Sequence, residues 1–240
     1  MRRVTDSGAR RGPSPLAALV GLVALVVGLY VAAHRSANSD SEAEESARAG
    51  LAVTNAALNA SMLAGACPGA AGFAALVGLG AAKPEVARQP LFKRVLGWAN
   101  WVLPMSWPVN AVGAAILAGN AIGHLVLGGR DERARIRSIT LDASCGCIVV
   151  EGGILYAPAF EGGFSMGVFT FITPGAQSVL PHEAGHALNL AAFGWLFHLT
   201  GGWDRKLRRD PMKAYAERLA EGNRPDSRRH DAIAFWRAAE

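Results

Sequence analysis

Two histidines and a glutamate within five residues carry the clearest chemical signal in the sequence. Residues 182–186 read His-Glu-Ala-Gly-His, so His182 and His186 are four residues apart. Residues four apart share one face of a helix, where two imidazoles reach a single tetrahedral zinc ion. Glu183 follows the first histidine and is placed to take a proton from an activated water. The pattern predicts a catalytic zinc site with His182 and His186 as ligands and Glu183 as the general base.

A catalytic zinc ion needs a third protein ligand, and a later segment of the chain offers two carboxylates. Glu217 and Glu221 share a helical face, so that one binds zinc while the other orients a histidine. Asp204 and His198 are rival ligands. We rank Glu217 first, Glu221 second and Asp204 third. The alternative is that both glutamates belong to the solvated face of an amphipathic helix.

The helices that must position these residues are predicted from periodicity and from proline and glycine. The first runs from about 180 to 193, with Ser178 as its N-cap and Pro181 in its first turn. The second opens at Asp210, which a proline follows, and ends at Gly222. These two helices are expected to bring the histidine pair and the glutamates together.

Three strands are predicted in the same half of the chain. The β-branched runs 136–141 and 148–151 indicate a hairpin, and 168–173 is apolar on both faces, as in a central strand. The expected fold class is α+β: an N-terminal transmembrane helix and a helical region, followed by a small antiparallel sheet packed on the helix that carries His182.

The overall composition excludes several classes of protein. The chain has 240 residues, of which 51% are hydrophobic and 18% charged, so it is not a disordered chain. Three cysteines exclude a disulfide-dense scaffold. Cys145 and Cys147 fall in the hairpin turn, either as free thiols or with a bridge to Cys67. A short basic run at 205–209 has no aromatic interleaving, and we predict no nucleic-acid partner.

Residues 16–33 form an uncharged, proline-free segment that predicts a membrane anchor. As a helix they would be about 27 Å long, close to the thickness of the hydrocarbon core. Four arginines precede the segment and four acidic residues follow it at 40–45, which places the N-terminus in the cytoplasm. The alternative is a cleaved signal peptide ending near Ala33.

Residues 49–129 are also strongly apolar, and here the sequence leaves two interpretations open. Prolines at 104 and 108 predict a turn, after which 109–127 is long enough for a second span. Asn110, Asn120 and His124 count against a span, so the region is either a membrane hairpin or a packed soluble one. The predicted organisation is therefore a basic tail, an anchor, an acidic linker, an apolar helical region and a catalytic region, at 1–15, 16–33, 34–48, 49–129 and 130–240.

The segment 182–186 resembles the zinc-binding helix of the zincin metallopeptidases. Glu217-Arg218-Leu219-Ala220-Glu221 is similar to the E-x-x-A-D pattern of the gluzincins, with Glu in place of the final Asp. The resemblance implies that Glu217 is the third ligand, with Zn²⁺ as cofactor and a peptide or protein as substrate. Residues 103–109, 163–171, 182–194 and 214–221 also look like a group of bacterial membrane-associated proteins of unassigned function.

Two further functions stay open beside a membrane-anchored zinc peptidase. Gly185 gives the HExGH form that is also found in site-2-type intramembrane proteases, although the later N-P-x-x-x-L-D-G-like segment of those enzymes is missing. A non-catalytic membrane protein that keeps a zincin-like fold for binding or assembly is the other. The expected partners are a peptide or protein substrate and the lipid bilayer, with the catalytic region extracytoplasmic if 16–33 is the single span.

Overall fold

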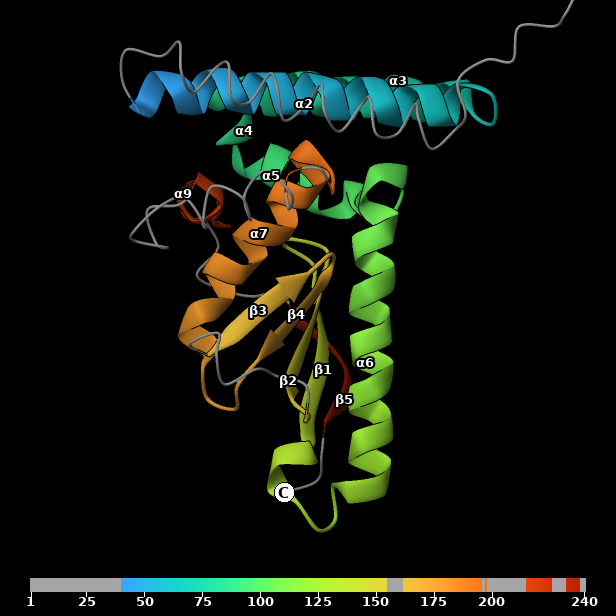
Figure 1. The fold of residues 1–240 in the computed structure, drawn as a ribbon, viewed down its shortest axis with the longest axis vertical. Coiled ribbons are helices and arrows are strands. Elements are labelled where there is room, and N and C mark those ends of the chain that lie inside the picture. Colours follow the sequence, from blue (N-terminus) through green and yellow to red (C-terminus); the bar gives the residue numbers. More distant parts are fainter. Residues whose placement is uncertain (1–39, 155–161, 196, 198–214, 226–231, 238–240) are drawn as a thin grey trace, which may run out of the picture.

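The fold combines helices with one sheet, as expected. The computed structural model describes residues 40–154, 162–195, 197, 215–225 and 232–237, so the predicted anchor at 16–33 lies outside the described residues. Within these ranges the chain forms seven α-helices and a five-stranded sheet. Figure 1 shows a helical layer across one end of the molecule and a sheet between single helices below it.

The first part of the chain is helical throughout. Two long helices, α2 (Asp40–Ala64) and α3 (Pro68–Ala82), pack side by side and lie across the top of the molecule in Figure 1. Two shorter helices and a 3-10 turn follow, at Pro84–Ala87 (α4), Pro90–Ala99 (α5) and Pro104–Ser106 (η1). The helix α6 (Trp107–Leu127) then runs down the molecule beside the sheet. The predicted turn and the helix after it are confirmed.

Proline punctuates these helices at their first positions. It occupies the first or second residue of α3, α4, α5, α6 and also of α7 (Leu180–Phe193). Proline has no N–H to donate, and the first N–H groups of a helix have no partner within the helix anyway. The predicted N-cap at Ser178 is wrong, because Gln177–Val179 forms a 3-10 turn and no side chain caps α7.

The sheet is mixed rather than antiparallel, which corrects one expectation. Its strands are β1 (Ile136–Asp142), β2 (Cys147–Gly152), β3 (Gly163–Met166), β4 (Phe169–Ile172) and β5 (Ala232–Arg237), in the order β3-β4-β2-β1-β5. The neighbours β2 and β4 run parallel, and the other pairs are antiparallel. The hairpin β1–β2 and the strand β4 were predicted, whereas β5 was not.

One helix covers each face of the sheet. Phe169 and Phe171 of β4 pack with Ile116 and Leu117 of α6 in one hydrophobic cluster. The alternate residue Ile172 faces the other way and packs against Leu180 at the start of α7. The sheet therefore separates α6 from α7, and the predicted metal ligands lie on the α7 side.

The largest hydrophobic cluster joins the helical first half to α7. It includes Leu51 of α2, Val77 of α3 and Leu96 of α5, together with Leu188 and Phe193 of α7. The helix α7 ends at Gly194, whose positive φ of 70° favours glycine and whose N–H bonds to the Leu190 carbonyl at 2.7 Å. The helix that carries the histidine pair is therefore part of the main core.

The cysteines are free thiols with very different surroundings. Cys67 is exposed between α2 and α3, whereas Cys145 and Cys147 are buried, so the bridge to Cys67 does not form. Hydrogen bonding to Cys145, together with burial, holds the pKa of the Cys147 thiol well above its usual range.

We expect an alkylating reagent to distinguish these thiols, because the thiolate is the reactive form. The raised pKa keeps Cys147 protonated as the pH increases toward about 8.5, the ordinary thiol range. Mass spectrometry of the native protein should find iodoacetamide on Cys67 alone, and on all three cysteines after denaturation. Equal labelling of Cys67 and Cys147 in the native protein would contradict the assignment.

Candidate metal centre

The helix α7 reaches the surface only along one short stripe. Eleven of its fourteen residues are buried, and the three that are partly exposed are Pro181, His182 and His186. The core packs around α7 from all other sides and so fixes the position of this stripe. The predicted histidine pair is therefore the accessible face of a rigid core element.

The two imidazoles converge on each other. Their Nε2 atoms are 3.2 Å apart, and the ring centroids are 4.9 Å apart with the planes inclined at 85°. Two nitrogens bound to one zinc ion at about 2.0–2.1 Å and a tetrahedral angle lie about 3.3–3.4 Å apart. The separation therefore fits a shared ion, and it also permits a hydrogen bond between the rings when one Nε2 carries a proton.

Glu183 is buried beside the pair and is held from the sheet side. Its side chain is 8% exposed. Its backbone carbonyl accepts a hydrogen bond from Ser165 of β3 at 2.7 Å, and that hydroxyl also lies 3.1 Å from the Thr170 hydroxyl of β4. These contacts fix the first turn of α7 against β3, and no sequence pattern predicted them.

The helix α9 (Tyr215–Gly222) packs directly against the histidine-bearing helix. A Cβ atom at Gly185 would overlap the backbone carbonyl of Ala220, so the two helices touch at a position where only glycine fits. One turn further on, Asn223 donates a hydrogen bond from Nδ2 to Oδ1 of Asn189 at 2.6 Å. The second predicted helix therefore does lie beside the first.

The two contacts also define the register between the helices. The residue numbers of both helical segments increase from the Gly185–Ala220 contact to the Asn189–Asn223 contact, so the two segments run in the same direction. Glu217 precedes Ala220 by three residues, and His182 precedes Gly185 by three. Continuing the register one turn back brings the position of Glu217 level with that of His182.

The remaining candidates for the third ligand are not placed by the structure. The side chains of Glu217 and Glu221, and the whole of Asp204 and His198, lie outside the described residues. Within the described ranges no third histidine, cysteine, aspartate or glutamate joins a histidine pair to form a metal-binding group. Two imidazoles are donors that zinc accepts, but among the described residues they do not form a complete metal site.

A buried polar network holds the end of α9 in place, which sequence patterns did not predict. Arg48 of α2 donates to the Ala81 carbonyl at 3.2 Å and to Oδ1 of Asn223 at 3.4 Å. Lys93 of α5 donates to the Arg224 carbonyl at 2.7 Å. Buried cations are costly unless they are paired or hydrogen-bonded, and here backbone carbonyls and an amide serve that purpose. The helical first half thereby positions the helix that carries Glu217.

Comparison with protein-family models, with curated proteins and with solved structures finds no match to this chain. The function is therefore argued from the fold and from the geometry of the histidine pair.

Proposed function

We propose that the chain is a membrane-anchored, zinc-dependent peptidase with a gluzincin-like arrangement of its two site helices. The observation that carries the proposal is the 3.2 Å approach of the His182 and His186 Nε2 atoms on the exposed stripe of a buried helix. Glu183 lies on the same turn, within the protein interior. This combination of two imidazoles and an adjacent buried carboxyl is what metal-assisted hydrolysis requires.

Each residue has a distinct task in this proposal. Held by His182 and His186, a zinc ion would supply Lewis acidity to a water molecule and to the carbonyl of the scissile bond. Glu183 accepts the proton of the attacking water and delivers it to the departing amine. His182 and His186 hold the ion, and the rigid core around α7 keeps their geometry fixed.

Glu217 is our first choice for the third ligand. This choice is supported by the register between α9 and α7, which brings the position of Glu217 level with that of His182. Glu221 is the second choice, with a role in orienting a histidine if it does not bind the ion. Asp204 is the third.

An extended peptide is the substrate that the neighbouring sheet favours. Within the described residues β3 is an edge strand, paired only with β4. Its Ser165 hydroxyl contacts the turn that carries Glu183. An edge strand offers unpaired N–H and C=O groups, to which an extended chain adds as a further strand.

Membrane attachment is the second part of the proposal. The helix from Pro104 to Leu127 is long and apolar enough to cross a membrane. The sequence adds the anchor at 16–33, with the N-terminus in the cytoplasm and the following chain outside.

Zinc analysis of the purified full chain tests the ligand assignment. We expect about one zinc ion per chain in the wild type, and its loss in His182→Ala and in His186→Ala, because two protein ligands do not retain a zinc ion. The matched control is His124→Asn, which changes a histidine on the far side of the sheet and should retain the metal. Zinc that stays stoichiometric in both alanine variants would reject the proposal.

A further inference from the structure

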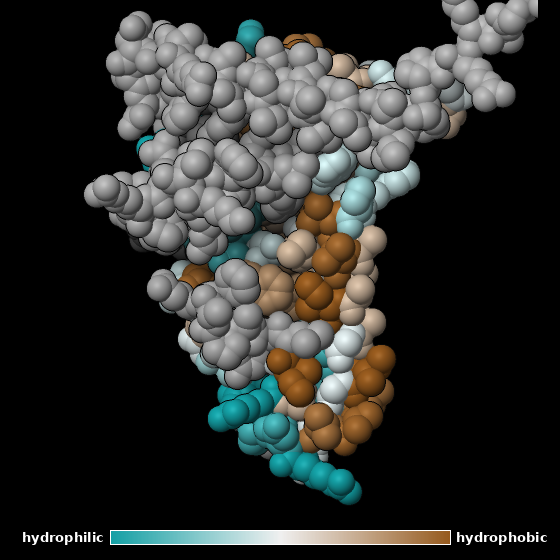
Figure 2. Space-filling model, in the orientation of Figure 1, coloured by the Kyte–Doolittle hydropathy of each residue, from teal (hydrophilic) through white to brown (hydrophobic). Residues whose placement is uncertain are grey.

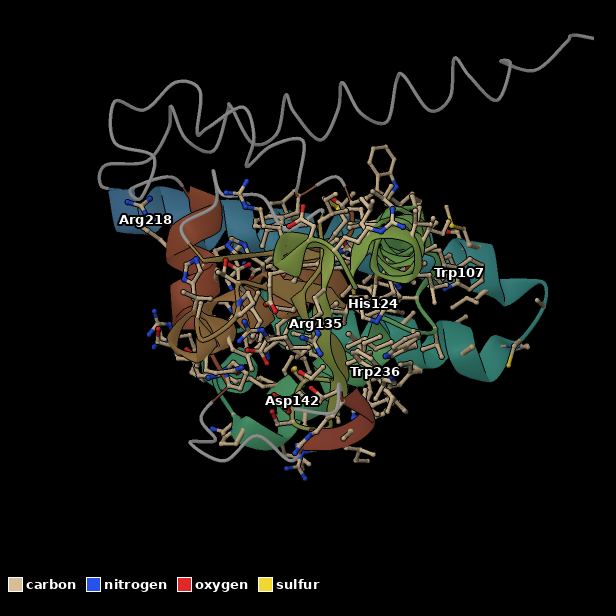
Figure 3. All side chains as sticks on the ribbon, turned by 90° about the horizontal axis from the view of Figure 1, so that it is seen from below. Trp107, His124, Arg135, Asp142, Arg218 and Trp236 are labelled. Carbon is tan, nitrogen blue, oxygen red and sulfur yellow. The ribbon has the colours of Figure 1, made fainter. Side chains whose placement is uncertain are left out.

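The helix α6 has its polar and apolar faces reversed relative to a helix on a water-exposed surface. Its polar side chains point toward the protein. Asn110 accepts a hydrogen bond from the Val168 N–H at 3.0 Å, and His124 accepts one from the Ile136 N–H at 3.2 Å. Asn120 is fully buried against Gly153. In the view along α6 in Figure 3, His124 lies on the side of the helix that faces the strands.

The opposite face of α6 contains no polar side chain. All the exposed residues of α6 are apolar. They are Trp107, Pro108, Ala111, Val112, Ala114, Ala115, Ala118, Ile122, Leu125, Val126 and Leu127. The exposed fraction reaches 82% at Leu125 and 66% at Val126. Figure 2 shows this hydrophobic surface running along α6. A helix that covers a soluble domain carries its charged residues on that face instead.

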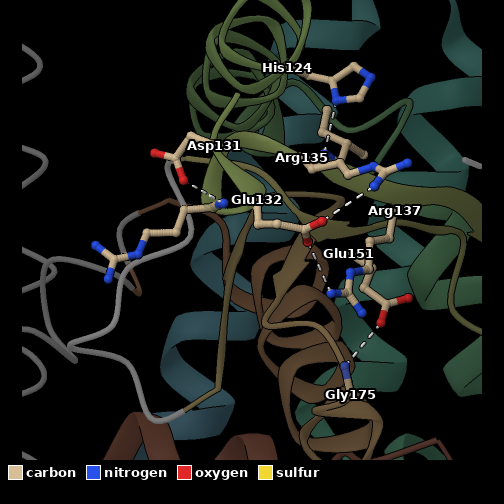
Figure 4. A network of polar contacts seen from close by, with 9 residues as sticks. His124, Asp131, Glu132, Arg135, Arg137, Glu151 and Gly175 are labelled. Carbon is tan, nitrogen blue, oxygen red and sulfur yellow. Dashed lines mark hydrogen bonds and ion pairs between the residues drawn. The ribbon is translucent and has the colours of Figure 1, made fainter. Parts of the chain in front are cut away.

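Each end of α6 carries residues that are typical of a membrane interface. At the N-terminal end, the exposed indoles of Trp98, Trp101 and Trp107 gather, with the Trp107 Nε1 donating to the Trp101 carbonyl at 3.3 Å. At the C-terminal end, residues 130–137 contain four arginines and two acidic residues. Figure 4 shows part of this group, in which Glu132 pairs with Arg135 at 3.4 Å and with Arg137 at 3.7 Å.

We infer that α6 spans the hydrocarbon core of a bilayer from one side to the other. Its apolar outer face contacts lipid, and its polar inner face contacts the sheet. The 21 residues of α6 span about 31 Å, which matches a hydrocarbon core of about 30 Å. Tryptophan is enriched at membrane interfaces, and arginine is enriched on the cytoplasmic side. With a first crossing at 16–33 from inside to outside, α6 returns the chain to the cytoplasmic side at Arg130.

The sheet contacts both ends of α6. The first residue of β1 contacts His124 near the lower end of α6, and the turn after β1 contacts the indoles at its upper end, through Trp98 to the Ala143 carbonyl at 3.1 Å. The sheet therefore lies alongside α6, which covers it on that face.

Spin labelling of the full chain in phosphatidylcholine–phosphatidylglycerol vesicles tests the inference without reference to the metal. Labels are attached to single cysteines at Ala111, Ala115, Ala118, Ile122 and Leu125, which form one strip on the outer face, in a Cys67→Ser background. We expect frequent collisions with oxygen, loss of collisions with a water-soluble nickel chelate, and greatest depth at Ala118. A label at Glu85→Cys in α4 is the exposed control and should collide with nickel.

Each of the other outcomes would overturn the inference. Nickel collisions along the strip that equal those at Glu85→Cys would mean that water covers the face. Exclusion of both reagents, with spin–spin broadening between chains, would mean that a second copy covers it. Equal depth at all five positions would mean that α6 lies along the membrane surface.

Discussion

Replacing Glu183 with glutamine is expected to abolish peptide hydrolysis while leaving zinc bound. Glutamine keeps the size of the buried side chain but does not accept a proton, and loss of a general base lowers a rate by about 10²–10⁴-fold. The proposed zinc ligands His182 and His186 are unchanged, so the metal content should equal that of the wild type. The measurement is turnover of a fluorogenic peptide library by the full chain, with zinc determined on the same samples.

The matched control for this variant is Glu85→Gln, on the exposed helix α4. It removes the same charge at an exposed position and should leave turnover unchanged. If Glu183→Gln hydrolyses peptides as fast as the wild type, the assignment of the general base is wrong. If the wild type binds zinc yet hydrolyses no peptide, the non-catalytic binding function becomes the better explanation.

Replacing Gly185 with alanine is expected to destabilise the protein and weaken zinc binding together. The added methyl group would overlap the backbone carbonyl of Ala220, and a backbone atom yields only if α9 moves away from α7. Overpacking of this kind costs about 1–3 kcal/mol, which lowers Tm by about 3–10 °C in a chain of this size. Displacing the helix that carries Glu217 should also raise the Kd for zinc about 10–100-fold.

Gly50→Ala provides the comparison, because Gly50 also lies within a helix but has no atom within 4 Å of its Cβ position. Alanine has the higher helix propensity, so this variant should keep or slightly raise Tm. Equal thermal stability of the two variants, or a normal zinc Kd in Gly185→Ala, would show that α9 does not depend on this close contact.

Local patterns predicted the elements that depend on local physics. The helix that carries His182 is confirmed because proline and a hydrophobic period specify it, and the hairpin β1–β2 because β-branched runs flank a turn. The parallel pairing of β2 with β4 was not predictable, because it joins segments whose separation in sequence leaves no periodic signal. The strand β5 pairs with β1 from the other end of the chain, for the same reason.

In the candidate site, too, local sequence patterns predicted some features, and contacts between distant segments determined the others. Four-residue spacing was enough to predict that His182 and His186 face each other. The close approach of Ala220 to Gly185 was not predicted. From sequence alone, a glycine within a helix indicates only a lower helix propensity, and the neighbour that requires it is not known. Arg48 was assigned to the acidic linker at 34–48, without a structural role. In the structure its side chain is buried and donates a hydrogen bond to Asn223. Tertiary contacts, rather than local preference, determine these roles.

The shared core around α7 has a consequence for anyone who shortens the chain. Leu188 and Phe193 meet Leu51 and Leu96, which belong to segments that precede Arg130. A fragment that starts at Arg130 would expose this hydrophobic face of α7 to solvent. It would also lose the hydrogen bonds from Arg48 and Lys93 to the residues that follow α9. Recombinant work on residues 130–240 therefore has to retain the upstream helices, which cover α7 and hold the end of α9.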